Sequence, residues 1–296
     1  MDNIISIKNL NKNFEEFHAL KNINLELEEN KVYGILGRNA VGKSTLLKIL
    51  AGHYKASSGS IKFKGEEYVK NPSNVRHICY VSDKTTLFDN FSVKEILKDA
   101  RDAYEKWDLE MEKRLINEFK VNVKKNYKKL SSGMKGIVAI IIGICSRTDI
   151  TIFDESYIGL DAVNRSIFYR ILMDDYMENP RTIIISTHFM DEVASLFEEI
   201  ILINDGELVE KCNIEDIEEK ALILAGNKEV IEKYIPKANI LQTETIGSFC
   251  KAHIDYRIDD NLRIKLKSEN IEIAKDSLQN WFVNYVIKLG GSNNEK

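Results

Sequence analysis

The sequence predicts an α/β fold built on a mainly parallel sheet. Through residues 1–215, segments typical of buried strands alternate with segments of helical periodicity. Three strand-like segments run directly into polar groups: 31–36 into a glycine-rich loop before Lys43, 150–153 into Asp154 and Glu155, and 181–187 into His188. Because ligands of such a sheet bind beyond the carboxyl ends of its strands, one site could gather these groups.

The composition is that of a folded protein with a substantial core. The chain has 296 residues, enough for one large domain or two smaller ones, with 44% apolar and 30% charged residues. A net charge of −4 argues against a protein built mainly to hold nucleic acid. The four cysteines lack metal-ligand spacing, so we expect reduced thiols in the cytosol.

No segment predicts a secretory signal or a membrane span. The N-terminus lacks a basic region followed by a long apolar run. The longest apolar run, 137–145, has nine residues, whereas a span needs about 20. We therefore expect a soluble chain that reaches a membrane only through a partner.

The first residues predict a small antiparallel sheet ahead of the glycine-rich loop. Residues 3–10 and 23–27 alternate apolar and polar side chains, which is typical of strands with one face on a core.

The segment from Gly37 to Thr45 has the P-loop pattern Gly-x-x-x-x-Gly-Lys-Ser between a predicted strand and a predicted helix. Its glycines would bring backbone N–H groups close to phosphate oxygens, at the positive end of the helix. Lys43 would reach the β- and γ-phosphates, and the Ser44 hydroxyl would hold Mg²⁺. The alternative is a glycine-rich turn that binds nothing. The expected contacts of the nucleotide are Gly37, Arg38, Asn39, Ala40, Val41, Gly42, Lys43, Ser44 and Thr45.

Beyond the P-loop, helical and hairpin patterns follow. Residues 92–119 predict a helix that opens with a capping box between Ser92 and Glu95. Residues 200–209 predict a hairpin around an Asp-Gly turn. The packed face of the predicted helix comprises Trp107, Met111, Leu115 and Phe119.

These motifs together resemble the nucleotide-binding subunits of the ATP-binding cassette (ABC) family. The P-loop matches Walker A, and 150–155 resembles Walker B with its following glutamate. Residues 130–134, Leu-Ser-Ser-Gly-Met, resemble the signature Leu-Ser-Gly-Gly-Gln, and 159–161 resemble the loop after Walker B. The resemblance covers about residues 1–215. It implies a P-loop NTPase fold with an N-terminal antiparallel β subdomain and a helical signature subdomain at about 84–148.

The resemblance also implies roles for single residues. Lys43, Glu155 and His188 would be catalytic, with Glu155 as the general base toward the attacking water and His188 contacting the γ-phosphate. Asp154 would orient Mg²⁺, and Phe14 would stack on the adenine of ATP. Phe14 could instead be an ordinary core aromatic.

In this family the signature closes over ATP that another subunit holds. Ser131 and Gly133 would therefore bind the γ-phosphate in trans at a helix N-terminus. The resemblance implies a head-to-tail dimer with a second nucleotide-binding subunit, either identical or related.

Some positions depart from the family pattern. Asp83 stands where a glutamine is usual, and its carboxylate could still meet the Mg²⁺ shell or the attacking water. Ser132 and Met134 alter the signature, and Ser156 replaces a proline. Similar variants fit bacterial exporters with separate membrane subunits, including exporters of peptides, toxins and antimicrobial compounds.

Residues 216–296 lie outside the resemblance and predict a small α+β accessory domain. Residues 262–267 alternate as a strand would, with 249–258 as the partner strand. Residues 271–289 carry apolar side chains at helical spacing and predict an amphipathic helix.

The resemblance implies an ATPase that uses ATP and Mg²⁺, binds integral membrane permease subunits at the cytoplasmic face of the cell membrane, and binds no nucleic acid. We expect Leu87, Phe88 and Phe91 to form the docking surface for the membrane subunit. The alternatives are a soluble ABC ATPase outside transport and a regulatory subunit that only binds ATP.

Overall fold

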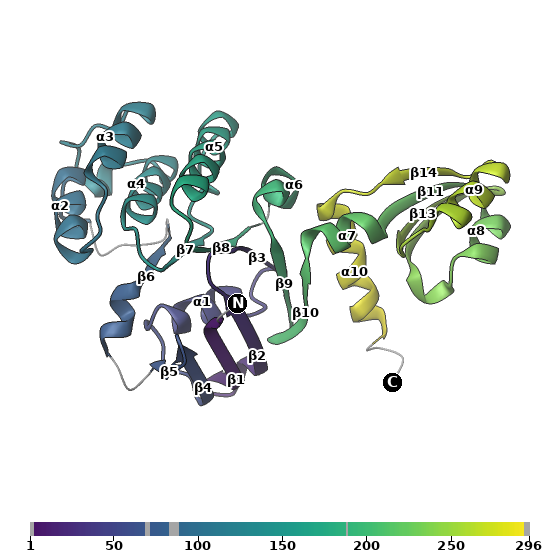
Figure 1. Ribbon diagram of the computed structural model, residues 1–296, viewed down its shortest axis with the longest axis horizontal. Helices are drawn as coiled ribbons and strands as arrows, with labels where there is room; N and C mark the ends of the chain where they lie inside the picture. The colour runs from purple at the N-terminus through teal and green to yellow at the C-terminus, as the bar shows by residue number, and fades with distance from the viewer. Residues whose placement is uncertain (1–2, 69–71, 83–88, 188, 293–296) are drawn as a thin grey trace. The chain divides into compact units, whose positions relative to one another are not determined.

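The protein is described by a computed structural model over residues 3–68, 72–82, 89–187 and 189–292. The chain divides into two compact units (Figure 1). The first comprises residues 1–188 and 196–211, and the second comprises 189–195 and 212–296.

The first unit contains a six-stranded sheet with the strand order β10-β9-β3-β8-β7-β6. β3 pairs in parallel with β8 and β9, and β7 pairs in parallel with β6 and β8. Every residue of β3, β7 and β8 is buried, as expected for strands covered on both faces. This sheet confirms the predicted α/β class. The strands are β3 (Val32–Leu36), β6 (Ile78–Val81), β7 (Ile150–Asp154), β8 (Thr182–Ser186), β9 (Glu199–Asn204) and β10 (Glu207–Asn213).

The turn between β9 and β10 is formed by Asp205 and Gly206. Their φ angles of 47° and 81° are both positive, as a type I′ hairpin turn requires. The predicted hairpin is confirmed.

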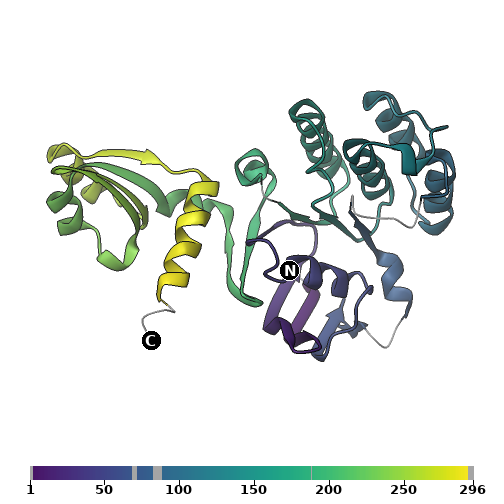
Figure 2. The same cartoon turned by 180° about the vertical axis from the view of Figure 1, so that it is seen from behind.

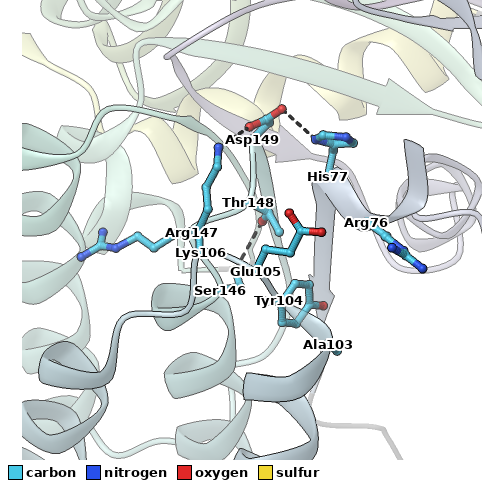
Figure 3. A pocket seen from close by; sticks show the side chains of 10 residues that line it. All are labelled: Arg76, His77, Ala103, Tyr104, Glu105, Lys106, Ser146, Arg147, Thr148 and Asp149. Carbon is cyan, nitrogen blue, oxygen red and sulfur yellow. Dashed lines mark hydrogen bonds and ion pairs between the residues drawn. The ribbon is translucent and has the colours of Figure 1, made fainter. Parts of the chain in front are cut away.

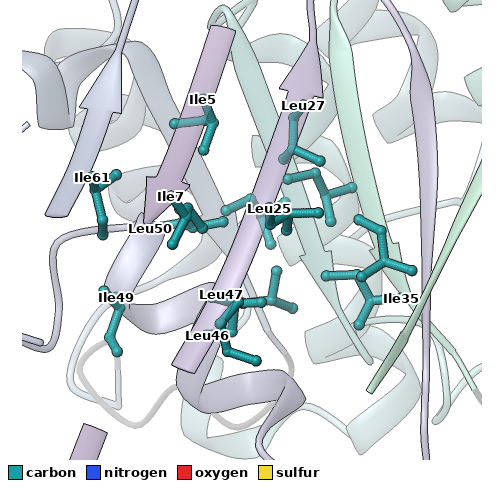
Figure 4. Packing of buried hydrophobic residues seen from close by; sticks show 14 of the residues in the cluster. Ile5, Ile7, Leu25, Leu27, Ile35, Leu46, Leu47, Ile49, Leu50 and Ile61 are labelled. Carbon is teal, nitrogen blue, oxygen red and sulfur yellow. The ribbon is translucent and has the colours of Figure 1, made fainter. Parts of the chain in front are cut away.

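A second, four-stranded sheet in the same unit has the order β2-β1-β4-β5. β1 pairs antiparallel with β2 and with β4, so the predicted antiparallel sheet also includes a strand from beyond the P-loop. Helix α1 (Lys43–Leu50) shares one hydrophobic core with both sheets, through side chains such as Leu46, Leu47 and Leu50 (Figure 4). The strands are β1 (Asn3–Phe14), β2 (Phe17–Glu28), β4 (Ser58–Phe63) and β5 (Glu66–Glu67).

Helices α2, α3 and α4 pack together beside the edge of the sheet that β6 and β7 form (Figure 1, Figure 2). The predicted helix over 92–119 is two helices, with the predicted capping box of Ser92 and Glu95 present at the first. Trp107 lies between them, where its Nε1 donates to Glu112 at 2.7 Å instead of continuing a helical stripe. Besides α1, the helices of this unit are α2 (Val93–Ala103), α3 (Leu109–Glu118), α4 (Ser132–Cys145) and α5 (Ala162–Glu178), with short 3₁₀ turns at Pro72–His77, Tyr127–Lys129 and Ala194–Leu196, the last ending in this unit.

A buried carboxylate ties α5 to the sheet. Asp175 has no exposed side-chain surface and binds the guanidinium of Arg181, on the segment leading into β8, at 2.8 Å. It also binds Arg147, which follows α4. Asp175 therefore binds both cations where water does not reach it, and Arg147 also binds Asp108 at 2.6 Å.

We expect Asp175→Ala to lower the free energy of unfolding by about 3–5 kcal/mol, because it leaves the buried guanidinium of Arg181 without its carboxylate and removes one of the two carboxylates that bind Arg147. Asp174→Ala is the matched control, since Asp174 is 51% exposed and its contacts with arginines are 3.9 Å or longer. Urea unfolding measures both variants. Equal losses of unfolding free energy in the two variants would contradict the stabilising role of the Asp175 ion pairs.

The second unit is an antiparallel sheet with the order β12-β13-β11-β14, covered by helices. Its β-α-β-β-α-β succession matches the split βαβ, ferredoxin-like motif. Its core is separate from that of the first unit and is centred on Leu224, Ala252 and Leu266. The elements are α6 (Met190–Val193), α7 (Ile214–Lys220), β11 (Ala221–Asn227), α8 (Lys228–Tyr234), a 3₁₀ turn (Lys237–Asn239), β12 (Ile240–Ile246), β13 (Phe249–Asp255), α9 (Asp260–Ser268), β14 (Glu272–Lys275) and α10 (Leu278–Ser292).

Two predictions for this unit were wrong. The predicted strand 262–267 is part of helix α9, because Asp259 caps the helix by accepting from Leu262 N at 2.7 Å. Leu262 and Leu266 also satisfy helical spacing and pack on the core, while Ile264 stays 67% exposed.

The predicted helix over 271–289 begins with a strand. Residues 272–275 form β14 against β11, and α10 starts only after Ser277, whose hydroxyl accepts from Asn280 N at 3.1 Å. The predicted strand at 249–258 is present in part, as β13, but it pairs with β11 and β12 and not with residues 262–267.

Within the described ranges, no helix combines the length and the apolar character that crossing a membrane requires.

Candidate functional site

The P-loop connects β3 to α1, and close packing explains its two glycines. A Cβ at Gly37 would lie 2.5 Å from the carbonyl oxygen of Ile203, and one at Gly42 would lie 2.6 Å from that of Ala19. Gly42 also has a φ of 109°, which side chains with a Cβ rarely adopt. Arg38, Asn39 and Ala40, at the tip, are exposed.

Lys43 occupies the inside of this loop and is only 5% exposed. Its Nζ donates to the carbonyl oxygens of Gly37, at 2.7 Å, and Arg38, at 2.9 Å. The loop therefore holds a buried positive charge where the pattern predicts phosphates.

The carboxylate of Asp154 lies at the end of β7 and is 4% exposed. Its Oδ1 accepts from Ser44 of α1 at 3.1 Å and from Ser186 of β8 at 2.7 Å. Its Oδ2 accepts from the hydroxyl of Tyr80, in β6, at 2.7 Å. The fold thus brings together the predicted metal pair Ser44 and Asp154, which are 110 residues apart in sequence.

Glu155, the predicted general base, directly follows that carboxylate in an unusual backbone conformation. Its φ is 53°, in the left-handed region that non-glycine residues rarely occupy and that is enriched at functional sites. Its backbone N–H donates to Ser186 Oγ at 3.1 Å. One serine hydroxyl therefore fixes both Asp154 and Glu155.

Sequence reasoning missed Tyr80 and Ser186. Each is a polar residue at or near the carboxyl end of a largely apolar strand, and this pattern could have indicated that both lie at the site. Neighbouring parallel strands bring such positions to the same edge of a sheet.

The predicted adenine contact, Phe14, ends β1 and is 40% exposed, so it is not the core aromatic that the alternative required. Its ring packs edge-on against Tyr54 with centroids 5.5 Å apart, and Lys12 Nζ lies 4.6 Å from its centroid. An exposed ring of this kind leaves a face available to a base.

The signature residues begin helix α4. Ser131 is its N-cap, and the hydroxyl accepts from Met134 N at 3.3 Å. A Cβ at Gly133 would lie 2.6 Å from the carbonyl oxygen of Gly159, and one at Gly136 would lie 2.4 Å from that of Ser156. The helix therefore sits directly on the backbone that follows Glu155.

The predicted site residues Asp83 and His188 lie outside the described residues, as do Leu87 and Phe88 of the predicted docking surface. Phe91 is described and is 42% exposed.

A separate cavity of about 190 Å³ lies at the opposite ends of β6 and β7 (Figure 3). Asp149 at its edge contacts Lys64 at 2.9 Å, His77 at 3.1 Å and Lys106 at 3.6 Å. Burial alone would raise the pKa of Asp149, but the hydrogen bond and charge of Lys64 hold it below its usual value. These contacts anchor the start of β7, away from Asp154 at its end.

Residues 20–157 match the family model described as ABC transporter. The chain carries an ABC transporter ATP-binding domain. The domain has the P-loop NTPase fold expected from the sequence, which a solved ABC cassette shares.

Similarity to other proteins extends beyond residues 20–157. The ABC transporter ATP-binding protein YtrB of Bacillus subtilis is 27% identical over 289 residues, which are 97% of this chain and 99% of the relative. The spermidine/putrescine import ATP-binding protein PotA of Thermotoga maritima is 27% identical over 287 residues, 92% of this chain and 78% of that protein. A solved dimeric ATP-binding cassette in a post-hydrolysis state, bound to ADP and Pi, has the same fold, with a TM-score of 0.63 and 21% identity over 71% of this chain and 98% of that one.

Directly after Glu155, the Ser156 hydroxyl is fully buried and has no hydrogen-bond partner within the part of the chain that the structure describes. We expect Ser156→Ala to raise the free energy of unfolding by about 1 kcal/mol, because the mutation removes a desolvated polar group. Ser186→Ala should instead lower it by about 1–3 kcal/mol, because that hydroxyl bridges Asp154 and Glu155. Thermal and urea unfolding compare the two. A loss for Ser156→Ala as large as that for Ser186→Ala would show that Ser156 is satisfied.

Proposed function

We propose that this chain is the ATP-hydrolysing subunit of a bacterial ABC exporter of peptides, toxins or antimicrobial compounds. It would work at the cytoplasmic face of the cell membrane, bound to integral membrane permease subunits. The observation that carries the ATPase assignment is the set of hydrogen bonds at the buried carboxylate of Asp154. Ser44, which follows the P-loop lysine, donates to it, and Ser186 joins it to the backbone of Glu155.

The residues at this point suit Mg²⁺. A hydroxyl and a carboxylate oxygen 3.1 Å apart are both oxygen donors, which Mg²⁺ prefers over nitrogen or sulfur. Ser44 would be a direct ligand and Asp154 would orient the ion directly or through water. Bound there, Mg²⁺ would offset the charge of the β- and γ-phosphates.

The roles of the other groups follow from their positions. Lys43 would exchange its two carbonyl partners for β- and γ-phosphate oxygens, which form stronger, charge-assisted bonds. Phe14 would stack on the adenine. Glu155 would take a proton from the attacking water as its oxygen bonds to the γ-phosphorus and the bond to the bridging oxygen of ADP breaks. His188 would contact the γ-phosphate, and Asp83 would meet the Mg²⁺ shell.

Closure would need a second nucleotide-binding subunit. Ser131 and Gly133 would bind the γ-phosphate held by the partner, using the exposed N-terminus of α4. ATP binding would close this head-to-tail dimer and hydrolysis would reopen it. The dimeric form of the similar solved cassette supports this arrangement.

Outward transport rests on the variant signature at Ser132 and Met134, which suits exporters with separate membrane subunits. The relatives include a spermidine/putrescine import protein, so direction calls for a direct assay. Inside-out membrane vesicles that carry the full complex should accumulate cargo when ATP is added outside. ATP-driven loss of cargo from such vesicles would indicate import.

We expect Lys43→Ala to abolish tight Mg-ATP binding, because the phosphates lose their buried cationic partner. Lys113→Ala, at a position that is 67% exposed on α3, is the control and should bind as the wild type does. Titration with a fluorescent ATP analogue measures both. Wild-type affinity in Lys43→Ala would refute the P-loop assignment.

We expect Glu155→Gln to bind ATP but hydrolyse it about 10²–10⁴ times more slowly, since the amide keeps the shape and cannot accept the proton. The variant should accumulate as an ATP-bound dimer on a sizing column. Glu110→Gln, at a position that is 84% exposed, should leave turnover unchanged. Undiminished phosphate release by Glu155→Gln would assign the base to another residue.

A further inference from the structure

Tyr80 holds the oxygen of Asp154 that no other described hydrogen bond reaches. Its hydroxyl donates to Asp154 Oδ2 at 2.7 Å, while Ser44 and Ser186 both donate to Oδ1. Burial first, and then the charge of Asp154, raise the pKa of the Tyr80 phenol.

The three donors to Asp154 differ in what else they must do. In the proposed function, the Ser44 hydroxyl binds Mg²⁺ directly. When it does, its hydrogen bond to Asp154 is lost. Ser186 also accepts from the backbone of Glu155. The Tyr80 hydroxyl contacts neither the P-loop nor Glu155 in any described hydrogen bond, and its other partner is Ser82. Its bond to Oδ2 is thus the one that metal binding need not disturb.

The surroundings keep this donor in place. Tyr80 lies in β6, which pairs in parallel with β7, so Tyr80 is directly opposite Ile152 in the strand that ends at Asp154. The Tyr80 ring packs edge-on against His53, with the centroids 5.0 Å apart. A stiff strand and a packed ring set the direction of the hydroxyl.

We propose that Tyr80 is a positioning residue for the metal-binding carboxylate: it fixes Oδ2 of Asp154 so that Oδ1 keeps facing Ser44 when Mg²⁺ and nucleotide bind. This inference rests on the proposed function of Ser44 and Asp154. Hydrogen bonds to a metal-ligating carboxylate orient it, and losing one typically weakens metal binding by about 10–100-fold.

The test compares Tyr80→Phe with Tyr68→Phe in the full chain. Tyr68 is a buried tyrosine of the same unit, whose hydroxyl donates to the carbonyl oxygen of Leu50 at 2.7 Å. Each variant loses one hydroxyl and keeps its ring. A fluorescent ATP analogue is titrated in EDTA, and the Mg²⁺ concentration that gives half of the Mg²⁺-dependent signal is then measured at fixed nucleotide.

We expect Tyr80→Phe to need about 10–100-fold more Mg²⁺ for half-saturation, with unchanged affinity for the analogue in EDTA. Tyr68→Phe should keep the wild-type Mg²⁺ dependence. A change in the Mg²⁺ titration alone indicates a positioning role, because general damage to the site would weaken the binding of the analogue in EDTA as well.

Two results would overturn the inference alone: equal Mg²⁺ half-saturation in the two variants, or loss of analogue binding in EDTA together with a lowered melting temperature in Tyr80→Phe. A wild-type protein whose nucleotide binding shows no Mg²⁺ dependence would instead overturn the proposed metal site itself, and the inference with it.

Discussion

A single buried carboxylate, that of Asp154, determines the geometry of the candidate site. An ionised group out of water is costly unless hydrogen bonds replace its hydration. Three hydroxyls do so here, and they come from α1, β6 and β8, so the bond set forms only when β7 and all three of these elements are in register. The carboxylate thus links the P-loop helix to three strands of the parallel sheet. Its own strand then turns directly into Glu155.

The position of the P-loop depends on a core shared by two sheets. Leu46, Leu47 and Leu50 of α1 belong to the same buried cluster as Ile5 and Ile7 of the antiparallel sheet and Ile35 of the parallel sheet (Figure 4). Apolar burial on both sides keeps α1 from rotating about its axis, and such rotation would carry Lys43 and Ser44 away from their partners. The antiparallel sheet therefore acts on the site through packing and presents Phe14 at the end of β1.

The sequence predicted those parts of the site that lie in contiguous motifs. Lys43 and Ser44 follow a glycine pattern, and Asp154 and Glu155 end an apolar run, so local order was sufficient. Tyr80 and Ser186 escaped notice because their importance comes from strand neighbours that are distant in the chain. The error at 262–267 has a different origin, because Leu-Arg-Ile-Lys-Leu-Lys satisfies the period of a strand and also places Leu262 and Leu266 one helical turn apart. Only the cap at Asp259 and the packing of Leu266 decide between them.

The glycine contacts of α4 separate two kinds of change in the signature. Gly133 and Gly136 face the backbone at Gly159 and Ser156 so closely that even a methyl group would have to displace main chain. Ser132 is exposed and Met134 is half-buried, so both positions already carry a side chain without displacing main chain. Side chains on the open side of the helix can therefore be exchanged without unseating it. In the proposed dimer, the strength of closure between subunits would then be set by side chains separate from the internal frame that carries Glu155, so that one scaffold could serve partners with different demands on turnover.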